Sequence, residues 1–122
     1  MEIKRILLVD DHAVLRQSFA YLLGQEPGLV IAQAGSLAEA RTRIKADGVD
    51  IALVDLRLPD GSGVDLILEL RQTSPRLPVL VLTISKDPAS NARALEAGAE
   101  EILSKEATLE EIVGAIERVT DG

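Results

Sequence analysis

The feature that most constrains the fold is a regular alternation of short apolar runs with longer segments of helical periodicity. Such alternation is typical of repeated βα units, which assemble into a parallel sheet with helices on its faces. The three central runs lack a polar–apolar alternation and are predicted to be buried on both faces. The five predicted strands are Ile3 to Val9, Leu29 to Ala34, Ile51 to Val54, Val79 to Leu82 and Glu101 to Leu103.

The segments between these runs carry signals for helix starts and stops. Ser or Thr followed three residues later by Glu has the spacing of a capping box, and an Asp-Pro pair suits an N-cap before the first helical residue. These signals are the boxes Ser36/Glu39 and Thr108/Glu111, the pair Asp87-Pro88, and Gly24 after a helix over Ala13 to Leu23.

The last two predicted helices differ in their apolar faces. The helix over Ala89 to Ala97 has Leu95 as its only large apolar side chain, so burial at roughly 25 cal/mol per Å² stabilises it little. We therefore expect it to be the mobile element of the domain. The last helix has an apolar stripe at helical spacing and should dock firmly. That stripe consists of Leu109, Ile112, Val113, Ile116 and Val119.

Composition limits the class of protein. A length of 122 residues suits one domain, 1–122, and we expect no output domain in this chain. The net charge of -7 repels nucleic-acid phosphates and anionic lipids, so we expect neither nucleic-acid contact by this domain nor membrane binding. The absence of Cys excludes thiolate metal sites, and the apolar run Ile6 to Val9 is too short for a signal peptide or membrane span.

Polar side chains follow four of the five predicted strands. Asp10 and Asp11 follow the first strand, Asp55 the third, Thr83 the fourth, and the fifth runs into Lys105. In an open parallel sheet, ligands bind beyond the carboxyl ends of the strands, near the point where strand order reverses. With the order 2-1-3-4-5, the first and third strands are neighbours about 4.8 Å apart, which brings the three carboxylates together.

Three clustered carboxylates repel one another, and either protonation of one of them or a hard divalent cation relieves the repulsion. We favour Mg²⁺, which takes oxygen ligands at roughly 2.0–2.1 Å and keeps several waters. Such an ion leaves coordination positions for substrate oxygens, while Lys105 and Thr83 add a cation and a hydroxyl donor. This arrangement suits a phosphoryl group.

Each of these residues alone has an ordinary explanation as a cap, a loop start or a surface residue. The order of acidic pair, acid, hydroxyl and lysine at the ends of strands one, three, four and five is what favours a site. His12 has no second His or Cys to complete a metal site, and we interpret it as a surface or capping residue. The loop Leu58 to Gly63 lacks the GxxxxGK[ST] spacing of a nucleotide site and is interpreted as a glycine-hinged turn.

Four stretches carry a resemblance to a known family: Leu8-Val9-Asp10-Asp11-His12, Asp55 to Gly63 (DLRLPDGSG), Leu82-Thr83, and Gly98-Ala99 through Lys105. Over nearly its whole length the sequence resembles receiver domains of two-component response regulators, most closely the NarL/FixJ (LuxR-type) subgroup. The resemblance implies a cytoplasmic α/β protein with a flavodoxin-like (βα)5 three-layer sandwich and a five-stranded parallel sheet of order 2-1-3-4-5.

The resemblance also implies roles for the site residues. Asp55 would accept a phosphoryl group from the phosphohistidine of a sensor histidine kinase. Asp11 would bind Mg²⁺ directly and Asp10 largely through water. The Asp55 carboxylate and the backbone carbonyl of Arg57 would complete the protein ligands.

In the same comparison, Lys105 would pair with the phosphoryl oxygens while the Thr83 hydroxyl swings toward them. Arg57 and Ser85 would tune how quickly water removes the phosphoryl group. The protein would thus be a phosphoacceptor switch that catalyses its own phosphoryl transfer and autodephosphorylation, not an enzyme acting on a separate substrate.

Two positions depart from the family pattern. Ile102 stands where a switching Tyr or Phe is usual, and Glu106 where Pro commonly follows the lysine, so the cis peptide often found there is left open. The resemblance implies an output, through a helix-turn-helix domain that binds DNA and controls transcription. It also suggests a homodimer, through the fourth helix, fifth strand and fifth helix or through the first and fifth helices.

Three alternatives use the same residues. A degenerate receiver would be a phosphorylation-independent interaction module, for which Ile102 is the suspicious feature and the intact site residues are the counter-argument. A phosphohydrolase with an aspartyl nucleophile typically has a second Asp two residues later, where this sequence has Arg57. A flavin-binding domain has a similar sheet, but the carboxylates would repel a flavin phosphate.

Overall fold

The computed structural model of the protein describes residues 2–121, apart from the side chains of residues 47 and 121. At its centre lies a five-stranded parallel sheet of order β2-β1-β3-β6-β7, which confirms the predicted topology. β4 and β5 form a separate antiparallel hairpin, so the fourth and fifth predicted strands are β6 and β7. The strands are β1 (Lys4–Val9), β2 (Leu29–Ala34), β3 (Ile51–Val54), β4 (Arg57–Leu58), β5 (Gly61–Ser62), β6 (Val79–Thr83) and β7 (Glu101–Ser104).

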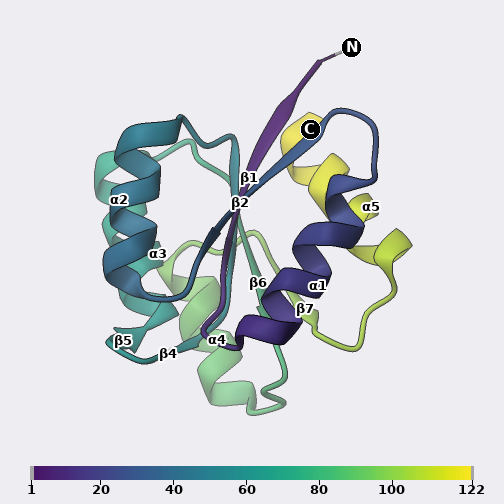
Figure 1. The fold of residues 1–122 in the computed structure, drawn as a ribbon. Coiled ribbons are helices and arrows are strands. Elements are labelled where there is room, and N and C mark those ends of the chain that lie inside the picture. Colours follow the sequence, from purple (N-terminus) through teal and green to yellow (C-terminus); the bar gives the residue numbers. More distant parts are fainter. Residues whose placement is uncertain (1, 122) are drawn as a thin grey trace.

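Helices cover both faces of the sheet. Figure 1 shows α1 and α5 on one side and α2, α3 and α4 on the other. None of these described helices is long and apolar enough to cross a bilayer. The helices are α1 (Ala13–Gly24), α2 (Leu37–Asp47), α3 (Gly63–Thr73), α4 (Pro88–Ala97) and α5 (Leu109–Asp121).

Alternate residues of the central strands enter two apolar cores, one on each face. In β1, Leu7 and Val9 pack with residues of α2, α3 and α4, whereas Ile6 and Leu8 pack with residues of α1 and α5. All residues of β3 and β6 are buried and alternate in the same way. Because both faces are covered, these strands give fixed positions to the polar side chains that follow them.

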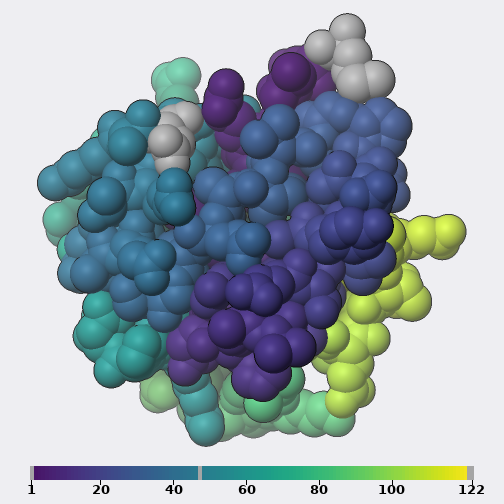
Figure 2. All heavy atoms as spheres, viewed as in Figure 1, coloured from purple at the N-terminus to yellow at the C-terminus, as the bar shows by residue number. Residues whose placement is uncertain are grey.

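The prediction that Leu29–Ala34 is buried on both faces is wrong. β2 is an edge strand in which Val30 is 47% exposed and only Ala34 is buried. In Figure 2, β2 lies at the surface between α2 and α1. An aliphatic run does not reveal whether its strand is central or at an edge, because strand order depends on packing between distant segments.

The predicted helix starts are present. In each of three helices the predicted capping oxygen accepts a backbone hydrogen bond at 3.1 Å: Ser36 from Glu39, Asp87 from Ala89, and Thr108 from Glu111. α1 includes Gly24 and is therefore one residue longer than predicted.

The last two helices pack as differently as expected. Ile112 and Ile116 of α5 are buried, which confirms the predicted stripe. In α4, Leu95 is 49% exposed, and the helix packs through Ala94 and Ala97 instead. The apolar contact of α4 is thus made by small side chains, and its mobility stays a prediction.

Candidate functional site

The ends of β1 and β3 place two aspartates side by side. Asp10 follows β1 and Asp55 follows β3, and the backbone N–H of Asp55 donates to the carbonyl of Val9 at 2.9 Å. Both aspartates are buried, at 1% and 6% exposure. A pair of buried carboxylates needs a compensating charge, because burial disfavours the ionised form.

Lys105 supplies that charge. Its Nζ lies 2.6 Å from Oδ2 of Asp10 and 2.7 Å from Oδ2 of Asp55, and its side chain is only 6% exposed. The lysine reaches this position because it follows β7, where its backbone N–H donates to the carbonyl of Thr83 at 3.0 Å. The residues that follow β1, β3 and β7 therefore meet, as predicted from their places after the first, third and fifth strands of the sequence.

The charges at this centre do not balance. Burial raises the pKa of the Asp55 carboxyl; the hydrogen bond and charge of Lys105 oppose this rise, and the charge of Asp10 adds to it. Burial alone would lower the pKa of Lys105, but the hydrogen bonds and charges of the two carboxylates outweigh burial and raise it. One ammonium shared by two carboxylates leaves excess negative charge.

The donor set fits a hard divalent cation. Asp10, Asp11 and Asp55 each offer a carboxylate oxygen, and these oxygens all lie within 4.8 Å of one another. Oδ2 of Asp10 and Oδ2 of Asp55 share the Lys105 ammonium, at 2.6 and 2.7 Å, so one cation leaves the three carboxylates with excess negative charge. An all-oxygen set with such an excess is what Mg²⁺ or Ca²⁺ would complete.

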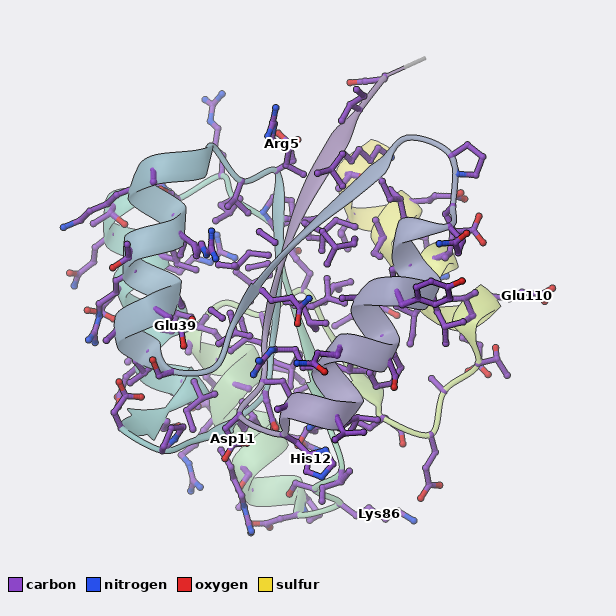
Figure 3. All side chains as sticks on the ribbon, in the orientation of Figure 1. Arg5, Asp11, His12, Glu39, Lys86 and Glu110 are labelled. Carbon is purple, nitrogen blue, oxygen red and sulfur yellow. The ribbon has the colours of Figure 1, made fainter. Side chains whose placement is uncertain are left out.

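A cavity of about 680 Å³ opens over this centre. Asp55 and Lys105 lie at its floor, whereas the more deeply buried Asp10 is not part of the lining. Figure 3 shows Asp11, His12 and Lys86 at the same end of the molecule. The lining residues are Asp11, His12, Leu15, Asp55, Arg57, Thr83, Ile84, Ser85, Lys86, Asp87 and Lys105.

Residues 6–117 match the family described as the response regulator receiver domain. The chain belongs to this family. The predicted family and fold are therefore confirmed, and the alternative of a phosphorylation-independent interaction module is not favoured.

Curated relatives of this receiver domain are transcriptional regulators. It is 39% identical over 119 residues to the DNA-binding transcriptional activator DevR/DosR of Mycobacterium tuberculosis, covering 97% of this chain and 55% of the relative. The chain spans little more than half the length of the first such relatives.

Solved structures of receivers share the whole fold. The signal receiver domain of the putative response regulator NarL from Mycobacterium tuberculosis has a TM-score of 0.91 at 30% identity, covering 100% of this chain and 99% of that one. A response regulator protein from Burkholderia pseudomallei with a phosphorylated aspartic acid, calcium ion and citrate has a TM-score of 0.86 at 31% identity, covering 97% of this chain and 69% of that one.

Two predicted residues of the receiver site lie at its side. Thr83 is buried, and its Oγ1 accepts a hydrogen bond from the N–H of Ser85 at 3.1 Å. Arg57 has an exposed side chain, and its backbone N–H donates to Oδ1 of Asp55 at 3.4 Å. Both line the cavity.

His12 caps α1, accepting from Leu15 N–H at 3.3 Å, as interpreted from the sequence.

The structure also describes the two positions that depart from the family pattern, Ile102 and Glu106. Ile102 is partly buried against the core under α2, α3 and α4. The peptide bond between Lys105 and Glu106 is trans, as are all others within residues 2–121. The segment interpreted as a glycine-hinged turn contains the β4–β5 hairpin, with Gly61 at a φ of 151°.

Sequence reasoning missed Arg16, which supports the receiver's acidic pair from α1. Its Nη1 donates to the carbonyl of Asp10 at 2.7 Å, and its Nε donates to Oε1 of Gln33 at 3.1 Å. The one signal in the sequence is that Arg16 lies six residues after Asp10, and this spacing is too common to predict a hydrogen bond between them.

Proposed function

We propose that this receiver domain accepts a phosphoryl group on Asp55 in a Mg²⁺-dependent reaction. The observation that carries the proposal is the position of Asp55 at the floor of the cavity, 2.7 Å from the ammonium of Lys105 and beside two further carboxylates. A carboxylate nucleophile next to a fixed cation and a cation site is suited to phosphoryl transfer.

The same carboxylates would hold the metal. Asp11 and Asp55 would bind Mg²⁺ directly, Asp10 largely through water, and the backbone carbonyl of Arg57 would complete the protein ligands. When bound, Mg²⁺ neutralises charge on the phosphoryl oxygens. The excess of three carboxylates over the single Lys105 ammonium supports this assignment.

The transfer then needs little from the protein beyond position and charge. An oxygen of Asp55 forms a bond to phosphorus as the P–N bond of phosphohistidine breaks, and the imidazole leaves with that electron pair. Lys105 stays protonated, since its pKa is raised, and its ammonium donates to the phosphoryl oxygens. Thr83 accepts from Ser85 N–H through an oxygen lone pair, which leaves its own O–H to donate to the phosphoryl group.

The phosphoryl group would also act as a switch. It carries about 1.5–2 negative charges in place of the single charge of the Asp55 carboxylate, and it brings three acceptor oxygens, which Lys105 and Thr83 satisfy by moving toward it. Thr83 ends β6, four residues before the cap of α4, so its movement pulls on that helix. Reversing a 1:99 equilibrium needs about 5.5 kcal/mol, so a partial shift of populations is expected. Water then removes the phosphoryl group, at a rate tuned by Arg57 and Ser85 in the cavity wall.

We propose a sensor histidine kinase in the cytoplasm as the phosphoryl donor and a DNA-binding output that controls transcription. The support is the class of the relatives, which are DNA-binding or transcriptional regulators of which this chain covers 55% and 59%. Homodimerisation through α4, β7 and α5, or through α1 and α5, would pass the signal on. Size-exclusion chromatography of the phosphorylated and unphosphorylated domain tests this, and a monomer in both states contradicts it.

The deciding experiment is intact mass after incubation with Mg²⁺ and acetyl phosphate. The wild type should gain one labile phosphoryl group, and Asp55→Asn should gain none. Asp50→Asn is a matched control, because Asp50 directly precedes β3, at the opposite end from Asp55, and accepts a hydrogen bond from Arg5 N–H. Absence of uptake by the wild type, with acetyl phosphate and with sensor kinases, would overturn the proposal.

A further inference from the structure

The turn of the β4–β5 hairpin carries an aspartate that reaches a distant helix. Asp60 lies in the two-residue link between β4 and β5. Its Oδ1 accepts a hydrogen bond from Leu37 N–H at 2.8 Å, and its Oδ2 accepts one from Ala38 N–H at 3.1 Å. These donors are the first two residues of α2, more than 20 residues earlier in the chain.

With this contact, the N-terminus of α2 is fully satisfied. Ser36 accepts from the third N–H, that of Glu39, at 3.1 Å, and the helical ladder begins with Ala40 N–H donating to the carbonyl of Ser36. The first N–H groups of a helix have no partner within it. Here one cap is local, from Ser36, and the other comes from the hairpin, through Asp60.

Apolar contact reinforces the junction between the hairpin and α2. Leu37 and Leu58 are both buried and belong to the same core. A Cβ atom at Gly61 would lie 2.7 Å from Cδ1 of Leu37, so the hairpin backbone sits directly against that side chain. The hairpin is therefore held against the start of α2 by both hydrogen bonds and apolar contact.

The hairpin is short, and it needs these contacts with α2 to keep a fixed position. β4 and β5 pair through only two residues each, Arg57 with Ser62 and Leu58 with Gly61. An isolated two-stranded hairpin is at best marginally stable in water. Yet this hairpin begins two residues after Asp55 and carries Arg57, which lines the cavity.

We infer that Asp60 is a positioning residue for the metal site: it fastens the hairpin to α2 and thereby holds the Arg57 carbonyl beside Asp55. The inference rests on the proposed function, in which that carbonyl is a Mg²⁺ ligand. Loss of Asp60 frees the turn, and the Arg57 carbonyl then spends less time at the ligand position. Residues that orient a metal ligand tune its affinity for the metal, and Asp60 would do so through the hairpin, without touching the ligand.

The test must separate positioning from simple helix capping, and Ser36 provides the matched control. Ser36→Ala removes a cap from the same helix without touching the hairpin, whereas Asp60→Ala removes the cap that the hairpin supplies. Asp60→Asn retains the shape and one acceptor oxygen. It should give an intermediate result, and it serves in place of Asp60→Ala if that variant does not fold.

Mg²⁺ binding is measured by isothermal titration calorimetry without any phosphodonor, alongside amide exchange of Leu37 and Ala38 by NMR. Asp60→Ala should weaken Mg²⁺ binding by about tenfold, while Ser36→Ala stays within about twofold of the wild type. Phosphorylation by acetyl phosphate should show the same shift in the Mg²⁺ concentration for half-maximal rate, with the rate at saturating Mg²⁺ little changed.

Equal Mg²⁺ affinities in Asp60→Ala and Ser36→Ala would overturn the inference, because Asp60 would then act as a cap alone. The proposed function fails separately, if the wild type takes no phosphoryl group. A wild type that binds Mg²⁺ without being phosphorylated, with binding weakened only in Asp60→Ala, would support the positioning role and overturn the phosphoacceptor role.

Discussion

Lys105 balances two buried carboxylates, and its removal should therefore affect stability more than any other single change of charge at the site. Lys105→Ala leaves Asp10 and Asp55 without their cation, and breaking a buried ion pair costs about 3–5 kcal/mol of unfolding free energy. We expect a loss near 3 kcal/mol at neutral pH without Mg²⁺, partly recovered on adding Mg²⁺. Urea unfolding followed by circular dichroism measures it, since the chain has no Trp.

Lys86→Ala is the control for this prediction. Lys86 lines the same cavity but is exposed, so its removal should change the unfolding free energy little. If Lys105→Ala is no less stable than Lys86→Ala, the two carboxylates do not depend on the ammonium, and the account of the site's charge is wrong.

Substitution of Asp55 should have the opposite effect on stability. The pKa of Asp55 is raised, chiefly by burial, so the folded protein disfavours the charged carboxylate that exists at neutral pH. Asp55→Asn is isosteric and uncharged, and should increase the unfolding free energy in Mg²⁺-free buffer. Urea titration of both proteins tests this. A loss of stability would mean that the Lys105 contact outweighs burial and the Asp10 charge.

Among the elements, α4 should respond to pH through its cap. Asp87 accepts from Ala89 N–H at 3.1 Å and from the Ser90 hydroxyl at 3.0 Å. The hydrogen bond from Ala89 is the main cause of the lowered pKa of Asp87. The charged cap therefore stabilises the fold above the unfolded-state pKa, and this contribution is lost as pH falls through the folded-state pKa.

Asp87→Asn keeps an N-cap and removes the charge. The stability difference between wild type and this variant should be largest near about pH 6 and shrink toward about pH 3. Thermal unfolding across this range measures the difference. A difference that stays constant with pH would show that the charge of Asp87 does not stabilise α4.

Two helical glycines should respond to alanine in opposite directions. At Gly63, the first residue of α3, a Cβ would lie 2.2 Å from the backbone oxygen of Asp55. Gly63→Ala must therefore move the Asp55 backbone or the helix, and it should cost about 3 kcal/mol of unfolding free energy. At Gly114 in α5 the nearest atom is the flexible Arg118 side chain at 3.5 Å, so Gly114→Ala should gain about 0.5–1 kcal/mol. Denaturant unfolding of both variants checks the signs, and stability unchanged in Gly63→Ala would contradict the close approach.

The elements themselves were predictable where their signals are local. The capping pairs at Ser36, Asp87 and Thr108 predicted helix starts because they depend on residues within one turn. The exposure of Val30 was missed because the aliphatic run was interpreted without the strand order, and the order 2-1-3-4-5 implied by the family resemblance already places β2 at an edge. The β4–β5 hairpin was also missed, since two-residue strands are too short for a periodic pattern.

For the whole molecule, one rule accounts for what was predicted of the site. The carboxyl ends of parallel strands share an edge, so Asp10, Asp55 and Lys105 were expected together and lie together. Arg16 and Asp60 support the same edge from α1 and from the hairpin, through contacts with backbone groups. No residue pattern encodes such contacts when they reach beyond one helical turn, because any chain segment has backbone groups to offer, and only the assembled fold selects one.

The same geometry links metal binding to global stability. Asp10 and Asp55 end two central strands that contribute to both cores, so a cation held there should bind only the folded chain. The unfolding free energy should then rise by about 1.4 kcal/mol per tenfold increase in Mg²⁺ above its dissociation constant, and chelation should reverse the gain. Urea unfolding at matched ionic strength measures this.

Asp11→Asn identifies the source of that gain. Asp11 is exposed, so its substitution should change the Mg²⁺-free protein little, yet it removes a proposed direct ligand and should abolish most of the Mg²⁺ dependence. If wild type and Asp11→Asn gain equally, the ion acts by screening the net charge of -7 over the whole surface. A gain confined to the wild type would place the stabilising ion at the carboxylate cluster, because general screening does not depend on one exposed side chain.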